Sequence, residues 1–280
     1  MSEPTPTSPR AAIGLVAGRG QYPLLFCRQA RAAGVGRIVV CAFHGETDES
    51  INDLADHVNW VYVGQINKCI KTFTKGDVSE LVFAGQIKPG RLFEGLRPDL
   101  RAVKILATMK AKNADTIFGT LVSEFAKDGL TVLPATTYLE AYLAQPGQMG
   151  RVKPSKAVLA DIALGQRIAR EVSALDIGQT VVVKDGVILA VEAFEGTDKA
   201  ILRGGELSRG GGITVVKVAK AGQDMRFDVP CIGLRTVESL TTAGAAALAL
   251  HAGKTLIIED GVQAALDTAK IAVVGMEMDD

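Results

Sequence analysis

In the first half of the chain, short apolar runs alternate with stretches in which apolar residues recur with the period of a helix. Nearly continuous apolar runs, two of which end in glycine, predict strands at residues 11–18, 37–43, 58–63 and 80–85. The stretches between them have the period of helices, most clearly over residues 21–33 and 65–75. Apolar strands joined by helices are typical of a parallel sheet covered on both faces. Further along, the pattern predicts helices at residues 101–112 and 116–128, with Gly129 as the C-cap of the second, and a strand at residues 131–135.

The second half mixes a hairpin with helices. Two alternating apolar runs flank Asp185–Gly186 and predict a β-hairpin over residues 181–196. The remaining pattern predicts helices at 156–175 and 241–253 and strands at 211–219, 254–259 and 271–275. The five glycines of residues 204–212 predict either a mobile loop that closes over a ligand or a plain connection.

A polar stretch with glycine and proline at residues 144–155 indicates the boundary between two domains. We therefore divide the chain into a short disordered tail (1–10), an N-terminal domain (11–145) and a C-terminal domain (146–280). Both are α/β domains, with a parallel sheet in the first and a different, mixed topology in the second.

Composition narrows the class of protein. The 31 basic and 31 acidic residues give a formal net charge of zero, which argues against a nucleic-acid-binding protein. No apolar run has the length of roughly 20 residues needed to span a bilayer, and the N-terminus lacks the apolar core of a signal peptide. The four cysteines and three histidines share no metal-ligand spacing, so we expect buried thiols in a reducing cytoplasm.

A glycine cluster follows the first predicted strand. Gly14, Gly18 and Gly20 precede Gln21, where a strand passes into a helix and backbone amides favour an anion. The spacing matches neither the dinucleotide fingerprint nor a P-loop, which disfavours a nicotinamide oxidoreductase. Phosphate contact and a tight structural turn both remain open.

Acidic residues gather in two places in the second half. One group comprises Glu192, Glu195 and Asp198, and the other comprises Asp224 and Asp228. Hard cations prefer such oxygen ligands, and phosphate-ester hydrolysis needs both a cation and a carboxylate near the attacking water. Solvated loop charge is the competing interpretation. Lys217 and Arg226 add positive charge suited to phosphate or to ion pairs.

An ordered set of motifs goes beyond these general patterns. The set consists of IGLVAGRGQYP, LVFAGQIKPGRL, KDGLTVLPATTYL, IGQTVVVKDGVILAVEAFEGTDKAI, GQDMRFDVPCIGLRT and AGKTLIIE. Together they resemble the LpxI family from about Ile13 to Gly275, nearly the whole chain. The resemblance implies a Rossmann-like N-terminal domain, a distinct mixed α/β C-terminal domain and a lipid substrate bound between them.

The resemblance also implies an activity. Family members hydrolyse UDP-2,3-diacylglucosamine, a lipid-linked UDP-sugar, to UMP and 2,3-diacylglucosamine 1-phosphate (lipid X) in lipid A synthesis, with water directed at the phosphorus nearer the sugar. It implies Mg²⁺ as cofactor, with Mn²⁺ as the alternative, a homodimer, and a cytoplasmic enzyme in transient peripheral contact with the inner membrane. A non-catalytic regulatory protein that binds a sugar nucleotide is the alternative function.

The motifs assign roles to residues of this chain. Asp224 is the expected catalytic carboxylate, with Asp228 second. The expected metal ligands are Glu192, Glu195, Asp198 and Asp224. The expected substrate-binding residues are Gly18, Gly20, Gln21, Gln86, Lys88, Thr197, Lys217, Gln223 and Arg226.

Overall fold

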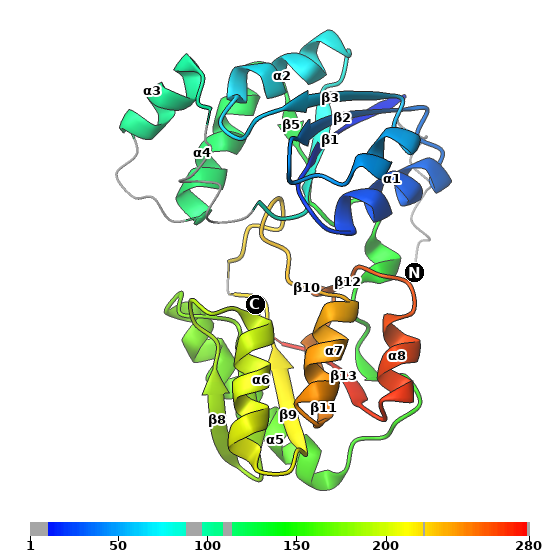
Figure 1. The fold of residues 1–280 in the computed structure, drawn as a ribbon, viewed down its shortest axis with the longest axis vertical. Coiled ribbons are helices and arrows are strands. Elements are labelled where there is room, and N and C mark those ends of the chain that lie inside the picture. The colour runs from blue at the N-terminus through cyan, green and yellow to red at the C-terminus, as the bar shows by residue number, and fades with distance from the viewer. Residues whose placement is uncertain (1–10, 88–96, 109–113, 221, 279–280) are drawn as a thin grey trace, which may run out of the picture. The chain divides into compact units, whose positions relative to one another are not determined.

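A computed structural model of the chain describes residues 11–87, 97–108, 114–220 and 222–278 (Figure 1). The chain forms two compact units. Unit 1 runs to Leu139 and also includes Asp224–Asp228, and unit 2 comprises Glu140–Gln223 and Val229–Asp280. The short segment Asp224–Asp228, which the sequence places in the C-terminal domain, thus packs with the first unit.

Unit 1 is built on a five-stranded parallel sheet of order β3-β2-β1-β4-β5. Its strands are β1 (Ala12–Ala17), β2 (Arg37–Phe43), β3 (His57–Val61), β4 (Glu80–Ala84) and β5 (Thr131–Val132). Its helices are α1 (Tyr22–Ala32), α2 (Ile66–Lys75), α3 (Leu100–Thr108) and α4 (Ala114–Ala126), with a 3-10 turn η1 (Glu49–Asp53). The predicted parallel α/β domain is confirmed. Helix α4 ends at Ala126, and Gly129, the predicted C-cap, lies three residues further on with a positive φ of 77°.

The core of unit 1 explains why its inner strands β1, β2 and β4 are almost entirely apolar. Phe73 of α2 and Phe125 of α4 pack with Leu81 and Phe83 of β4 on one face of the sheet. Helix α1 buries Leu25 and Phe26 apart from this cluster. Strands with helices on both faces have no polar face, so β2 is buried at every position after Arg37.

Unit 2 contains a six-stranded mixed sheet of order β6-β13-β11-β9-β7-β8, in which β9, β11 and β13 are parallel. The strands are β6 (Gly147–Met149), β7 (Thr180–Lys184), β8 (Val187–Val191), β9 (Ile213–Lys217), β11 (Ala245–His251) and β13 (Ala272–Met276). A separate pair joins β10 (Cys231–Ile232) to β12 (Leu256–Ile257). The helices are α5 (Lys156–Ala174), α6 (Thr197–Ser208), α7 (Leu234–Thr242) and α8 (Val262–Thr268). A short 3-10 turn, η3 (Glu140–Tyr142), precedes β6.

Helices cover both faces of this second sheet (Figure 1). Helix α5 packs Ile162 and Ala169 against alternate residues of β7 and β9. Ile201 of α6, Leu240 of α7 and Leu266 of α8 lie in the core on the other face. The hairpin of β7 and β8 is confirmed, and both of its turn residues, Asp185 and Gly186, have positive φ. The expected fold class, two α/β domains with different topologies, is therefore confirmed.

The sequence pattern did not predict α7 and α8, and it indicated the wrong secondary structure in two further segments. Within residues 241–253, predicted as one helix, Ala245–His251 form the central strand β11. Their small apolar side chains fit between two neighbouring strands and two layers of helices. Most of the glycine-rich stretch 204–212, predicted as a loop, belongs to helix α6. A Cβ at Gly204 would lie 2.4 Å from Val182 Cγ1, so this glycine allows the helix to pack closely on the sheet.

The predicted linker and the cysteines can also be placed. Within residues 144–155, β6 pairs with β13 and forms an edge of the sheet of unit 2. None of the four cysteines, all of them among the described residues, forms a disulfide; three are buried and Cys231 is half-buried. Burial raises the pKa of the Cys27 thiol to about 12, which makes it unreactive at neutral pH.

Candidate functional site

Several chain segments of unit 2 meet at the carboxyl edge of its sheet. Strand β9 ends at Lys217, β8 ends just before Glu192, and α6 begins at Thr197. Because β7 runs antiparallel to β9, its first residue, Thr180, lies opposite Lys217. Ligands of α/β proteins bind outside this edge of a sheet, where loops and helix N-termini gather. The topology therefore brings four polar residues of separate elements to one place.

These four residues form a hydrogen-bonded group, here named the Lys217 cluster. Lys217 Nζ donates to Thr197 Oγ1 at 2.8 Å, and Thr197 Oγ1 donates to Glu192 Oε1 at 3.0 Å. Thr180 Oγ1 lies 3.4 Å from the same hydroxyl. Lys217 and Glu192 are only 4% and 8% exposed. Buried charged groups are costly unless they are paired, so this cluster is the least expected feature of unit 2 and the strongest candidate for a site.

The cluster also has capacity for further interactions. Glu192 Oε2 is buried and has no hydrogen-bond partner among the described residues. Helix α6 begins after Gly196, whose φ is 85°, and no side chain caps the amides of its first turn. A buried ammonium group beside an uncapped helix N-terminus favours an anionic ligand such as a phosphate group.

The acidic group near α6 does not act as a unit. Arg203 Nη2 donates to Glu195 Oε1 at 2.6 Å, and this hydrogen bond is the main cause that lowers the pKa of Glu195. Asp198 pairs with Arg235 at 2.9 Å, whereas Glu192 accepts from Thr197. Each carboxylate thus has its own partner. Among the described residues, no group of three or more His, Cys, Asp or Glu side chains is arranged to hold a metal ion.

Asp224 belongs to the segment that packs with unit 1. The Ala135 amide donates to the Met225 carbonyl at 2.7 Å, and Phe227 stacks on Phe118 of α4 with ring centroids 5.4 Å apart. These two contacts fix the segment on either side of Arg226. Asp228 closes the turn, where its amide donates to the Asp224 carbonyl at 3.0 Å.

Arg226 holds the Asp224 carboxylate in a bidentate ion pair. Its Nε donates to Oδ1 at 2.9 Å and its Nη2 to Oδ2 at 2.6 Å. The hydrogen bonds from this guanidinium lower the pKa of Asp224 below its usual value. The side chain of Asp224 is still 30% exposed, so an ionised carboxylate is presented to solvent. Such a group suits metal binding or the positioning of water better than proton donation.

The glycine turn of unit 1 is shaped by contact between two backbones. The Gly18 amide donates to the Ala84 carbonyl at 2.8 Å, and the Arg19 amide donates to the Gln86 carbonyl at 2.8 Å. A Cβ at Gly18 would lie 2.6 Å from the Gln86 carbonyl oxygen. Gly18 is therefore required by the packing of the β1 and β4 loops, and this explains the motif without a ligand.

Other predicted binding residues of unit 1 and of the loop before Asp224 can be placed. Gly20 has a φ of 92° and open space where a side chain would be, and Gln21 begins α1 without capping it. Gln223 accepts the Lys220 amide at 2.7 Å, and its buried Nε2 has no hydrogen-bond partner in the described part of the chain. Lys88 lies outside the described residues. Substrate contact by all of these residues stays a prediction.

Sequence reasoning missed two residues at the edge of the second sheet. Thr180 is completely buried beside Thr197, and His251, at the end of β11, accepts the Ala219 amide at Nδ1. His251 was hidden because residues 241–253 were predicted as a helix. Gly244 and Gly253 flank a run of eight residues, a length typical of a buried strand. This spacing is the signal that could have indicated a strand ending near His251.

Comparison with known proteins covers both halves of the chain. Residues 12–142 match the LpxI N-terminal domain and residues 145–274 match the LpxI C-terminal domain. UDP-2,3-diacylglucosamine pyrophosphatase LpxI of Caulobacter vibrioides is 31% identical in an alignment that covers 95% of this chain and 97% of that protein.

Similarity to solved structures is much weaker. The crystal structure of N5-carboxyaminoimidazole ribonucleotide synthetase in complex with ADP matches with a TM-score of 0.24 and 11% identity. The match covers 69% of this chain and 44% of that one, which is too distant to bear on fold or function. The full-length match to the Caulobacter protein and the two domain matches are decisive: the chain belongs to the LpxI family.

Proposed function

We propose that this chain hydrolyses the pyrophosphate bond of UDP-2,3-diacylglucosamine and releases UMP and 2,3-diacylglucosamine 1-phosphate in lipid A synthesis. The observation that carries the proposal is the 31% identity, over 95% of the chain, to the Caulobacter protein named for this activity. The Lys217 cluster supports it, because a buried ammonium group and an uncapped helix start suit the charge of a phosphate.

Asp224 is the carboxylate that we assign to the reaction. Arg226 keeps it ionised and fixes its orientation, so it is prepared to position the attacking water. Water adds to the phosphorus nearer the sugar, the bond from that phosphorus to the bridging oxygen breaks, and UMP leaves. Hydrolysis in ¹⁸O-labelled water should therefore place the label in 2,3-diacylglucosamine 1-phosphate and leave UMP unlabelled.

The proposed Mg²⁺ dependence needs a ligand set different from the one expected from sequence. Glu195 and Asp198 are engaged by arginines, so these residues do not fit a cage made by the protein alone. Mg²⁺ is commonly held by one or two carboxylates together with substrate phosphates, and Asp224 or the free oxygen of Glu192 fits that smaller role. When bound, the metal would neutralise the phosphate charge.

The decisive assay measures UMP release by the purified protein with and without EDTA. We expect activity that EDTA abolishes and Mg²⁺ restores. Asp224→Asn should lower kcat by about 100-fold or more, because the variant loses the negative charge near the attacking water. Asp56→Asn is the matched control, since Asp56 forms an ion pair of the same 2.6 Å length with Arg31. It should keep normal kcat.

Other outcomes would contradict the proposal. Full activity of Asp224→Asn would move the catalytic role to another residue. Full activity after removal of all metal would exclude the Mg²⁺ dependence. If the wild-type protein binds UDP-2,3-diacylglucosamine in calorimetry but releases no UMP, the alternative function, a regulatory sugar-nucleotide-binding protein, would replace the hydrolase.

A further inference from the structure

Thr197 is the first residue of helix α6, but its side chain does not serve that helix. Threonine hydroxyls near a helix start commonly bind backbone amides of the first turn, yet no side chain caps α6. The Thr197 hydroxyl is directed at the sheet instead, where it contacts side chains from β7, from β9 and from the residue after β8. It is therefore committed to the Lys217 cluster.

The hydrogen-bonding capacity of this hydroxyl is used up inside the cluster. A hydroxyl offers one proton and two lone pairs. The proton of Thr197 goes to Glu192 Oε1 at 3.0 Å, and one lone pair accepts from Lys217 Nζ at 2.8 Å. Because that proton is used, Thr180 at 3.4 Å can only donate to the second lone pair. This saturation favours an indirect role for Thr197 over the direct substrate contact expected from the motifs.

Glu192 supplies the fixed end of this chain of contacts. Its backbone amide donates to the Thr180 carbonyl at 2.8 Å, and a Cβ at Gly178 would lie 2.0 Å from its carbonyl oxygen. Its side chain is buried; Oε1 accepts from Thr197, and Oε2 has no hydrogen-bond partner among the described residues. The Glu192 carboxylate thus acts on the ammonium group of the cluster through the hydroxyl, not by a direct ion pair.

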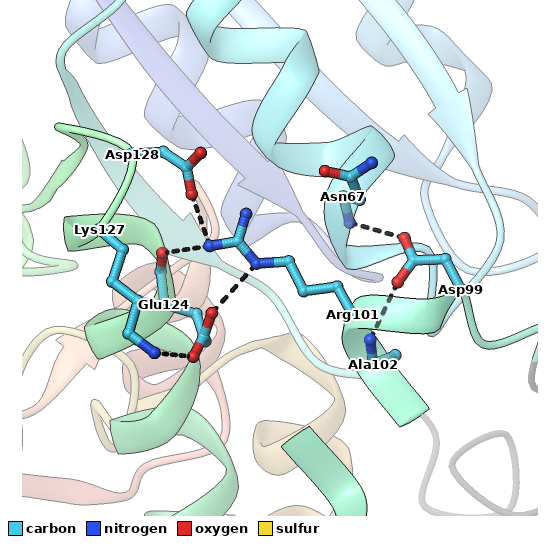
Figure 2. A network of polar contacts seen from close by, with 7 residues as sticks. All are labelled: Asn67, Asp99, Arg101, Ala102, Glu124, Lys127 and Asp128. Atoms are coloured by element: carbon cyan, nitrogen blue, oxygen red, sulfur yellow. Dashed lines mark hydrogen bonds and ion pairs between the residues drawn. The ribbon is translucent and has the colours of Figure 1, made fainter. Parts of the chain in front are cut away.

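A polar network in unit 1 shows the alternative way to hold a cation (Figure 2). Arg101 of α3 donates to Glu124 of α4 at 3.0 Å and pairs with Asp128, just after α4, at 2.5 Å. Both carboxylates contact the guanidinium directly, and this pairing joins the two helices. In the Lys217 cluster, a neutral hydroxyl stands between the carboxylate of Glu192 and the cation. That arrangement orients a cation and suits one that also interacts with an anionic ligand.

We propose that Thr197 is a positioning residue, whose hydroxyl, anchored by Glu192, directs the Lys217 ammonium group toward a phosphate group of the substrate. The proposal rests on the proposed function for the identity of that substrate. Thr197 touches no reacting atom and acts only through Lys217. The anchoring contact uses Oε1 of Glu192, so it leaves the metal-binding role considered for Oε2 unaffected.

A double-mutant cycle tests whether Thr197 acts through Lys217. The values of kcat/KM for UMP release are compared among wild type, Thr197→Val, Lys217→Met and the double variant. Thr197→Val replaces the hydroxyl by a methyl group and should lower kcat/KM about tenfold, as for loss of a hydrogen bond to a charged group. Lys217→Met and the double variant should have the same kcat/KM, because without the ammonium group the hydroxyl has nothing to position.

The substrate is dispersed in detergent for these assays, because it carries two acyl chains. None of the helices in the described parts of the chain is long and apolar enough to cross a membrane. The thermal midpoint of every variant is measured alongside its activity. If Thr197→Val does not fold, Thr197→Ala, which also lacks the hydroxyl, takes its place in the cycle.

Two matched variants separate positioning from folding. Thr197→Ser retains the hydroxyl and should keep most of the activity. Thr72→Val is the control in unit 1, because Thr72 is 6% exposed and its hydroxyl makes the same kind of bridge. It accepts from Asn59 Nδ2 at 2.7 Å and donates to the Lys68 carbonyl at 3.0 Å. Thr72→Val should lower the thermal midpoint and leave kcat/KM unchanged.

Three results would overturn the proposal. Additive losses in the double variant would mean that Thr197 acts independently of Lys217. Full activity of Thr197→Val would exclude a role for the hydroxyl. Equal losses in Thr197→Ser and Thr197→Val would assign the effect to packing, since only the first variant keeps the hydroxyl.

Failure of the positioning role can be told from failure of the proposed function. If wild type releases UMP and Thr197→Val releases it equally fast, only the positioning role is rejected. If wild type releases no UMP, the proposed function fails, and the same cycle is measured on the Kd for UDP-2,3-diacylglucosamine by calorimetry. Losses of affinity that are not additive would then uphold the positioning role, whereas additive losses or absence of binding would overturn it.

Discussion

Both units have a β-sheet packed against helices, but the carboxyl edges of the two sheets are filled in different ways. In unit 1, the loops after β1 and β4 close on each other through backbone hydrogen bonds, and Gly18 leaves no room for a side chain. In unit 2, the equivalent edge holds the buried Lys217 cluster. A strand–turn–helix position therefore does not define a site by itself, and buried ionisable side chains are the more informative signal.

The contrast between the two sheet edges fails if the Lys217 cluster only stabilises the fold. Lys217→Met retains the aliphatic stem and removes the ammonium group, so we expect kcat/KM to fall on the order of 100-fold, as for loss of a charge-stabilising donor. Lys217→Arg, which restores a cation, should recover part of the loss. UMP release and the thermal midpoint are measured together. A loss of activity that merely follows a loss of folded protein would make the cluster structural.

The opposite test applies to the glycine turn of unit 1. Gly18→Ala should lower the free energy of unfolding by about 2 kcal/mol or more, because its Cβ would press against the Gln86 backbone. Gly20→Ala should cost only about 1 kcal/mol, from the strain of its positive φ. Urea unfolding measures both. Full stability of Gly18→Ala together with a raised KM would restore the phosphate-binding interpretation of this turn.

Strand β9 provides an internal control for buried polar groups. Thr214 is completely buried and its hydroxyl has no hydrogen-bond partner among the described residues. Thr214→Val keeps the shape and removes that group, so we expect the free energy of unfolding to rise by about 1 kcal/mol with unchanged kcat. Destabilisation by this variant would show that an unseen partner satisfies the hydroxyl, and would weaken the contrast with Lys217.

The smallest expected effect concerns the pH dependence set by Arg226. Its hydrogen bonds lower the pKa of Asp224, so the carboxylate stays ionised as the pH falls. Arg226→Met should return this pKa toward its ordinary value, and protonation would then begin at a higher pH. We expect the acid limb of the kcat/KM profile to move upward in pH. An unmoved limb would mean that Asp224 does not titrate in the catalytic profile.

The sequence predicted the elements that are specified by a local turn or by apolar residues along the whole element. Continuous apolar runs identified the strands of unit 1, and Asp185–Gly186 identified the hairpin, because turn chemistry and burial on both faces leave direct patterns in the chain. The motifs also identified the family. The strand within residues 241–253 was not predicted, because alanine and leucine favour a helix in isolation. Only pairing with the neighbouring strands β9 and β13 makes this segment a strand.

The candidate site shows the same division between sequence and structure. The sequence supplied Lys217, Thr197 and Asp224 as polar residues in motifs, but spacing could not tell which carboxylates share a partner. Tertiary structure decided that Glu195 and Asp198 pair with arginines and that Thr197 joins Glu192 to Lys217. It also decided that Asp224–Asp228 packs with unit 1, since the contacts of Met225 and Phe227 are made with residues about 90 to 110 positions earlier in the chain. Pairings over such separations leave no periodic signal in one sequence, because they depend on where the strands bring each segment.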